Sequence, residues 1–194
     1  MKQLSPSDLM SLEQYARERA VVRARMIEHR QRRRLALGPN CTVSFEDLET
    51  VRYQIQEMLR AERIFEPEGI AEELEVYNPL VPDGRNFKAT LLLEFPDPVE
   101  RARRLAEMRG VERCCWLEVQ GCTRIVAIAD EDLERENEHK TAAVHFLRYE
   151  LSAPMVNALK AGAALAAGID HPAYQHTLDP LPAPLRQALL ADLD

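Results

Sequence analysis

The chain has 194 residues and a mass of 22.1 kDa, which is enough for one domain with a sizeable buried core. Its residues are 46% hydrophobic and 29% charged, as in ordinary globular proteins, which excludes collagen-like, low-complexity and disordered classes. The longest nearly apolar stretch, residues 161–169, is far shorter than the roughly 18 residues that a membrane-spanning helix needs. We therefore expect a single domain, residues 1–194, that does not enter a membrane.

The net charge of −7 is unevenly distributed along the chain. Residues 1–40 hold nine Lys or Arg against four Asp or Glu, a balance of +5 that leaves −12 for residues 41–194. We therefore divide the domain into a basic helical segment, 1–34, and an acidic globular body, 35–194. The acidic body disfavours general nucleic-acid binding, whose affinity depends on many Lys and Arg contacts to phosphates. The first residues lack the apolar run of a secretory signal, so we expect a cytoplasmic protein.

The four cysteines show no spacing typical of a metal site or a redox pair. They stand at positions 41, 114, 115 and 122, without a C-x-x-C pair or histidines at zinc-ligand spacing. We expect free thiols that pack as small apolar side chains, and a redox role is the alternative.

The first half of the chain predicts a helical start followed by a hairpin and two helices. Ser5, Pro6 and Asp8 are typical of a helix N-terminus, and helical composition continues, with or without a break, to residue 33. Alternating apolar residues around a Gly-Pro-Asn turn predict a hairpin over 35–45. Apolar residues at helical spacing predict helices over 50–64 and 69–77.

The second half mixes strands with short helices. Alternating apolar residues predict a strand over 87–95, because one face of such a strand is buried. The other elements that we expect are a helix over 97–109, a hairpin of 113–119 with 122–129, a loop or exposed helix over 130–138, a strand over 142–151, a helix over 152–162, a strand over 164–169 and a helix over 185–193. This order, without a sustained strand–helix–strand rhythm, predicts an α+β fold with a mainly antiparallel sheet and several packed helices.

Glu62 interrupts an apolar stripe. It lies one turn beyond Leu59, on the stripe that Val51 and Ile55 begin, where an apolar residue is expected. A buried carboxylate must be ion-paired, hydrogen-bonded, protonated or bound to a metal. Glu62 is therefore either part of a structural ion pair or part of a functional site.

A carboxylate–histidine metal site is one functional hypothesis. His145 lies on the more apolar face of its strand and is either a hydrogen-bonded core histidine or a ligand. Residues 170–174, Asp-His-Pro-Ala-Tyr, follow a strand and form either a site or a turn. The metal hypothesis assigns an iron or zinc ion to Glu57, Glu62, His145 and His171, and pocket-lining roles to Tyr77, Asp170 and Tyr174. No H-x-x-x-H or H-E-x-x-H spacing supports it.

The arginine run at residues 30–34 suits an interaction with a partner. Three interpretations are open for this run: a solvated or salt-bridged face, a contact to an acidic protein or ligand, or a contact to nucleic acid. The arginines concerned are Arg30, Arg32, Arg33 and Arg34. No aromatic residue lies between them to stack on bases, so nucleic acid is disfavoured. No glycine-rich phosphate loop, G-x-S-x-G turn or kinase signature is present, so nucleotide enzymes are disfavoured as well.

Several segments resemble a bacterial family that is defined only as a domain of unknown function, about 190 residues long. The most specific is 54–64, QIQEMLRAERI, and the others are 32–40, 73–78, 143–148 and 169–174. The resemblance implies a genomic setting beside rubrerythrin-like and heterodisulfide-reductase-like iron–sulfur proteins. It therefore favours an accessory or interaction protein of a redox or peroxide-defence system, whose partner is an iron–sulfur or rubrerythrin-like protein. The alternative is a metal-dependent enzyme or sensor.

Overall fold

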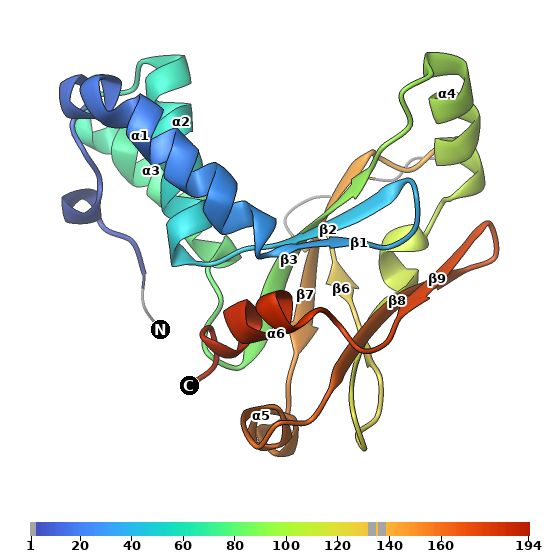
Figure 1. Ribbon diagram of the computed structural model, residues 1–194. Helices are drawn as coiled ribbons and strands as arrows, with labels where there is room; N and C mark the ends of the chain where they lie inside the picture. Colours follow the sequence, from blue (N-terminus) through green and yellow to red (C-terminus); the bar gives the residue numbers. More distant parts are fainter. Residues whose placement is uncertain (1–2, 132–134, 136–138) are drawn as a thin grey trace.

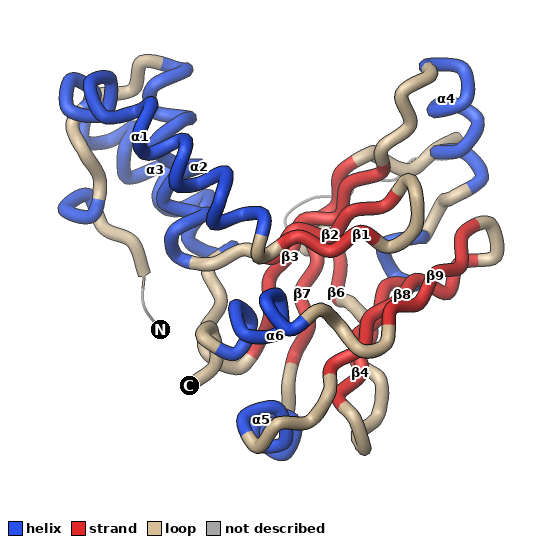
Figure 2. Tube along the Cα trace, viewed as in Figure 1, coloured by secondary structure: helices blue, strands red, loops and turns tan. Residues whose placement is uncertain are grey.

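The computed structural model describes residues 3–131, 135 and 139–194, and it separates three N-terminal helices from two antiparallel sheets (Figures 1 and 2). The helices are α1 (Leu12–Gln31), α2 (Leu48–Glu62), α3 (Pro67–Tyr77), α4 (Pro98–Glu107), α5 (Ala153–Lys160) and α6 (Ala183–Leu190). Short 3₁₀ turns are η1 (Pro6–Asp8), η2 (Asn78–Leu80) and η3 (Val111–Cys114). None of the described helices combines the length and the apolar character that a membrane span requires.

The strands form one five-stranded and one four-stranded sheet. Their bounds are β1 (Arg34–Ala36), β2 (Cys41–Phe45), β3 (Asn86–Leu93), β4 (Cys115–Val119), β5 (Ile125–Val126), β6 (Ile128–Ala129), β7 (Val144–Glu150), β8 (Leu165–His171) and β9 (Tyr174–Leu178). The larger sheet has the order β1-β2-β3-β7-β6 and the smaller one β5-β4-β8-β9, with antiparallel neighbours in both. Only Ala127 separates β5 from β6, so the two sheets meet at this edge. The α+β prediction is confirmed.

The main core lies between the two sheets. Period-two alternation in β3 turns Phe87, Ala89 and Leu91 inward, where they join side chains such as Leu117 and Ile169 of the smaller sheet. A second apolar cluster holds the N-terminal helices together through Val51, Ile55 and Leu59 of α2, with Leu74 of α3. The helical unit therefore has a small core of its own beside the larger one.

Most predicted elements are present, with local shifts. The expected N-terminal helix is broken at residues 9–11, between η1 and α1. Of the segment 130–138, residues 132–134 and 136–138 lie outside the described residues. The expectation that the chain leaves the sheet at Asp170 is wrong, because β8 continues to His171 and turns directly into β9.

Glu62 is not buried, so the expectation of a buried carboxylate is wrong. Glu62 is the last residue of α2, and Arg63 leaves the helix with φ of 58°. Ile64 then folds back, donates its amide to Leu59 O at 2.9 Å and packs on the helical cluster. The apolar position that the periodicity assigned to Glu62 is thus filled by Ile64, as in helix ends that close with a left-handed residue.

Candidate functional site

Two adjoining cavities lie along the C-terminal half of α1. The first has a volume of about 520 Å³ and lies between α1 and α2; we call it the α1–α2 groove. Its lining residues include Met10, Val22, Arg25, Met26, Glu28, His29, Arg32, Glu49, Arg52 and Tyr53. The second, of about 1010 Å³, lies between the end of α1, the start of α2, residues 81–84 and α6, and we call it the junction cavity. His29, Arg32 and Glu49 line both cavities.

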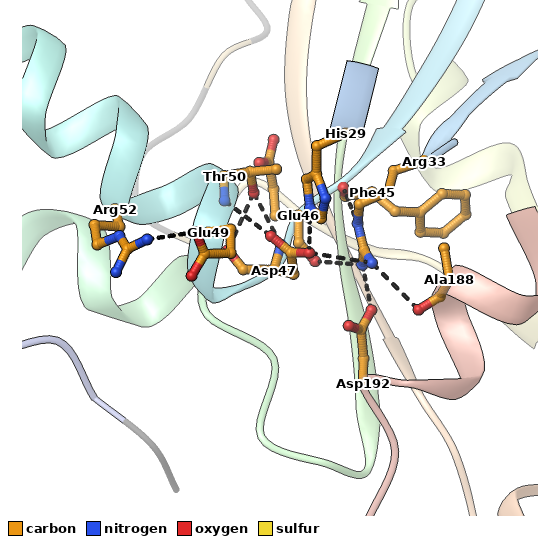
Figure 3. A network of polar contacts seen from close by, with 10 residues as sticks. All are labelled: His29, Arg33, Phe45, Glu46, Asp47, Glu49, Thr50, Arg52, Ala188 and Asp192. Carbon is orange, nitrogen blue, oxygen red and sulfur yellow. Dashed lines mark hydrogen bonds and ion pairs between the residues drawn. The ribbon is translucent and has the colours of Figure 1, made fainter. Parts of the chain in front are cut away.

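Arg33 lines the junction cavity and joins three parts of the chain (Figure 3). Its guanidinium donates to Phe45 O at 3.1 Å, Glu46 O at 3.1 Å and Ala188 O at 3.2 Å. It also forms ion pairs with Asp47, at 3.2 Å, and with Asp192. Because Arg33 is only 2% exposed, these contacts fix the end of α1 against β2 and α6.

The expectation that Arg33 forms part of an exposed partner-binding face is therefore wrong. Residues 33–37 alternate between buried and exposed, so Arg33 shares the inward face with Leu35 and Leu37. The other arginines of the run reach solvent. Arg34 pairs with Glu94 at 3.3 Å, and the guanidinium of Arg30 lies 5.3 Å from the centre of the Tyr53 ring.

His29 and Asp47 form the exposed end of the same network. His29 Nε2 lies 2.7 Å from Asp47 Oδ2, and the imidazole is 36% exposed toward the cavities that it lines. Asp47 is also the N-cap of α2, since its Oδ1 accepts from the amide of Thr50 at 2.8 Å. The pair therefore ties the last turn of α1 to the first turn of α2.

Burial raises the pKa of Asp192 to about 6, against the opposing effect of the Arg33 guanidinium. A carboxyl with a raised native pKa stabilises the fold fully below its unfolded pKa, near 3.8, and this contribution is lost as the pH rises through 6. We expect the unfolding free energy of the wild type, minus that of Asp192→Asn, to increase by about 1 kcal/mol from pH 7 to pH 5. Urea denaturation of both proteins across this range measures the difference, and a constant difference would contradict the assignment.

The four residues of the metal hypothesis have separate environments. Glu57 accepts hydrogen bonds from Arg19 and Tyr15, and Glu62 is exposed at the end of α2.

The two histidines also have separate hydrogen-bond partners. His145 is fully buried, with Nδ1 2.6 Å from Asp130 and Nε2 2.9 Å from Thr141. Nε2 of His171 lies 2.9 Å from Arg109 O, and its Nδ1 accepts from the amide of Ala173 at 3.1 Å. Within residues 3–131, 135 and 139–194, no group of three or more His, Cys, Asp or Glu could hold a metal ion. The metal site remains a prediction without geometric support.

The three residues expected to line a pocket are also separated. Asp170 is exposed and pairs with Arg124 at 2.7 Å. Tyr174 is buried, and its hydroxyl donates to Leu37 O at 2.7 Å and accepts from the amide of Asn40 at 3.1 Å. Tyr77 lines a third cavity, of about 280 Å³.

The cysteines are free, as the sequence predicts. Burial raises the pKa of the Cys41 thiol to about 11 and that of Cys115 well above its ordinary value. Such thiols carry little thiolate, which is the reactive form. Within the described residues that line the groove and the junction cavity, there is no Ser, Thr or Cys beside His29. The charged and polar side chains that do line the two cavities are suited to polar binding.

The sequence analysis missed His29, Asp47 and Asp192, and also Arg25 and Arg52 of the groove. The signal for Asp47 is the spacing Asp47-x-x-Thr50 ahead of an apolar helix, which is typical of a capping box. Asp192 carries no local signal, since its partner Arg33 lies 159 residues away.

Residues 3–193 match the family model for a protein of unknown function, DUF3501. The chain belongs to this family. The chain is also similar to a solved structure, a novel protein of unknown function from Burkholderia pseudomallei K96243, with 45% sequence identity, a TM-score of 0.94 and full coverage of both chains. No curated protein matches the chain. Membership in the DUF3501 family confirms the resemblance to a family of unknown function.

Proposed function

We propose that the protein is a cytoplasmic accessory protein that docks an acidic segment of a partner protein in the α1–α2 groove. The observation that carries the proposal is the placement of Arg25, Arg32 and Arg52 around the apolar side chains of that groove. Guanidinium groups bind carboxylates with good geometry, so they suit an acidic segment.

The ion pairs that now occupy these arginines are weak. Arg32 pairs with Glu28 at 2.8 Å, one turn away on α1, and these side chains are 64% and 68% exposed. Arg52 pairs with Glu49 within α2, and both are more than 40% exposed. Exposed pairs of this kind contribute about 0.5 kcal/mol or less, so carboxylates of a partner can replace them at little cost. Arg25 has no ion-pair partner within the described part of the chain.

The apolar side chains of the groove suit a helical or extended segment. Met26 is buried, while Met10 and Val22 are partly exposed. Methionine adapts its shape to different partners, and amphipathic helices bind in grooves of this composition. We therefore expect a partner segment with apolar residues on one side and carboxylates on its flanks.

The proposal extends to the identity of the partner. The partner that we expect is an iron–sulfur or rubrerythrin-like protein of a redox or peroxide-defence system, to which this chain would be an accessory. Docking in the groove does not depend on which protein the partner is, so the docking site and the redox role of the partner are tested separately.

The test is co-purification of the full chain with the candidate iron protein at low and at high salt. We expect a complex at low salt that dissociates at high salt, because exposed charges are screened. Arg25→Glu with Arg32→Glu should weaken the association by at least about tenfold. Bound iron and its absorption spectrum identify the captured protein.

The matched control reverses two exposed arginines, Arg101 and Arg103, of α4, a helix that lies far from α1 (Figure 1). This variant has the same net charge as the groove variant, and we expect its binding to change by less than about twofold. Equal losses in the two variants would show a general charge effect and overturn docking in the groove. Absence of a complex with the candidate iron protein at low salt would overturn the redox setting.

A further inference from the structure

A third cavity is lined jointly by the N-terminal helices and by strands β2, β3 and β7 of the five-stranded sheet. Its volume of about 280 Å³ is slightly below the range of roughly 300–1,000 Å³ typical of ligand sites, so it suits a very small ligand. Its floor is a row of cross-strand neighbours, since Ser44 of β2 pairs with Thr90 of β3 and Thr90 pairs with Phe146 of β7. Concave sites between two structural units are a common location for small-molecule binding.

The charged residues of this cavity are a guanidinium and a carboxylate that do not pair with each other. Arg30 stacks on Tyr53, and Glu46 accepts a hydrogen bond from the Thr90 hydroxyl at 2.8 Å. Neither side chain forms an ion pair with any residue that the structure describes. Both are half-buried, and partial loss of solvent makes an unpaired charge costly. A ligand with one anionic and one cationic group would satisfy both.

The remaining lining adds hydrogen-bonding groups and an apolar surface. Tyr77 and Gln54 come from the helices above the sheet. The Tyr77 hydroxyl is protonated at neutral pH and can donate, and burial raises its pKa further. The apolar residues are Val51, Leu80, Leu92 and Phe146. They suit a short aliphatic group rather than a sugar or a nucleotide.

We propose that this cavity binds a free α-amino acid with an aliphatic side chain. Its carboxylate pairs with Arg30, its ammonium group with Glu46, and its side chain packs on Leu92 and Phe146. None of the three groove arginines lines this cavity, so this proposal and partner docking can fail independently.

The experiment measures the thermal stability of the full chain with L-leucine, 3-methylbutylamine and 4-methylpentanoate. The amine lacks the carboxylate and the acid lacks the ammonium group, so the comparison with leucine measures how much each charged group contributes to binding. We expect leucine to raise the melting temperature in a saturable way, because a ligand that binds the folded state stabilises it. Each analogue should bind at least about tenfold more weakly.

Two variants and one control assign the binding to this cavity. Glu46→Gln keeps the hydrogen-bond acceptor for Thr90 but removes the charge, and it should weaken leucine binding at least about tenfold. Arg30→Lys keeps the charge and should retain measurable binding. Glu100→Gln, which changes an exposed carboxylate on α4 that lines none of the three cavities, should bind like the wild type. No saturable shift with leucine or with any standard amino acid at millimolar concentration would overturn the proposal. Unchanged leucine binding in Glu46→Gln would do so as well.

Discussion

Replacing Arg33 by methionine should lower the unfolding free energy by about 3–5 kcal/mol at pH 7.5, the cost of removing one partner from a buried ion pair. Methionine preserves much of the buried volume, so the loss reports the polar contacts. Asp47 and Asp192 would remain mostly buried without their shared cation. Three carbonyl groups would also lose a donor, and each unsatisfied buried group adds to the cost. Urea denaturation followed by circular dichroism measures the change.

The neighbouring arginine provides the control for this prediction. Arg34 follows Arg33 directly but is half exposed, and its pair with Glu94 is equally exposed. Arg34→Met should therefore change stability by less than about 0.5 kcal/mol. The loss in Arg33→Met should also be smaller at pH 5 than at pH 7.5, because protonation of Asp192 removes one of the two carboxylate charges that lose Arg33. A loss below about 1 kcal/mol, or one equal to that of Arg34→Met, would contradict the role of this network.

Local patterns predicted the parts of the fold that local interactions determine. The alternation around Leu91 predicted β3, because one face of the strand is buried against the core. The helical spacing of Val51, Ile55 and Leu59 predicted α2 for the same reason. The pattern was wrong at Glu62, where the helix ends, because the left-handed turn at Arg63 lets Ile64 occupy the apolar position.

The contacts of Arg33 with Asp47, Asp192 and Ala188 could not be predicted from local sequence patterns. Leu35 and Leu37 point inward, and the same period-two pattern assigns Arg33, two residues before Leu35, to the buried face. Because Arg33 lies within a run of arginines, it was interpreted as exposed. Its partners Asp192 and Ala188 come from the other end of the chain, so only the tertiary fold brings them together. The α1–α2 groove and the third cavity likewise form between elements, which explains why single-element reasoning found Tyr77 and Arg30 but not the cavity that they share.

Glu57→Gln should weaken the attachment of α1 and lower the unfolding free energy by about 2 kcal/mol at pH 7. Glu57 accepts from Arg19 Nε at 2.8 Å and Nη2 at 2.7 Å, and from the Tyr15 hydroxyl at 2.5 Å. These contacts join α1 to α2, and Tyr15 is one of only two residues of α1 that are buried among those described. The Arg19 guanidinium and the Tyr15 hydroxyl, acting against burial, lower the pKa of Glu57 to about 2.

The pH dependence of this effect has a definite sign. A carboxyl with a lowered native pKa stabilises the fold above its unfolded pKa, near 4.5, and this contribution is lost as the pH falls through 2. The stability difference between wild type and Glu57→Gln should therefore be full at pH 6 and shrink toward zero near pH 2. Glu49→Gln, which disrupts an exposed pair on the same helix, should cost less than about 0.5 kcal/mol at every pH.

Hydrogen exchange connects this prediction to the docking groove. If Glu57 holds α1 in place, the amides of α1 should exchange faster in Glu57→Gln while those of β3 and β7 keep their protection. The partner should also bind more weakly, although the three groove arginines are intact, because one wall of the groove would be less often in position. Unchanged exchange in α1, or a loss of protection throughout the sheets, would show that Glu57 does not anchor this helix.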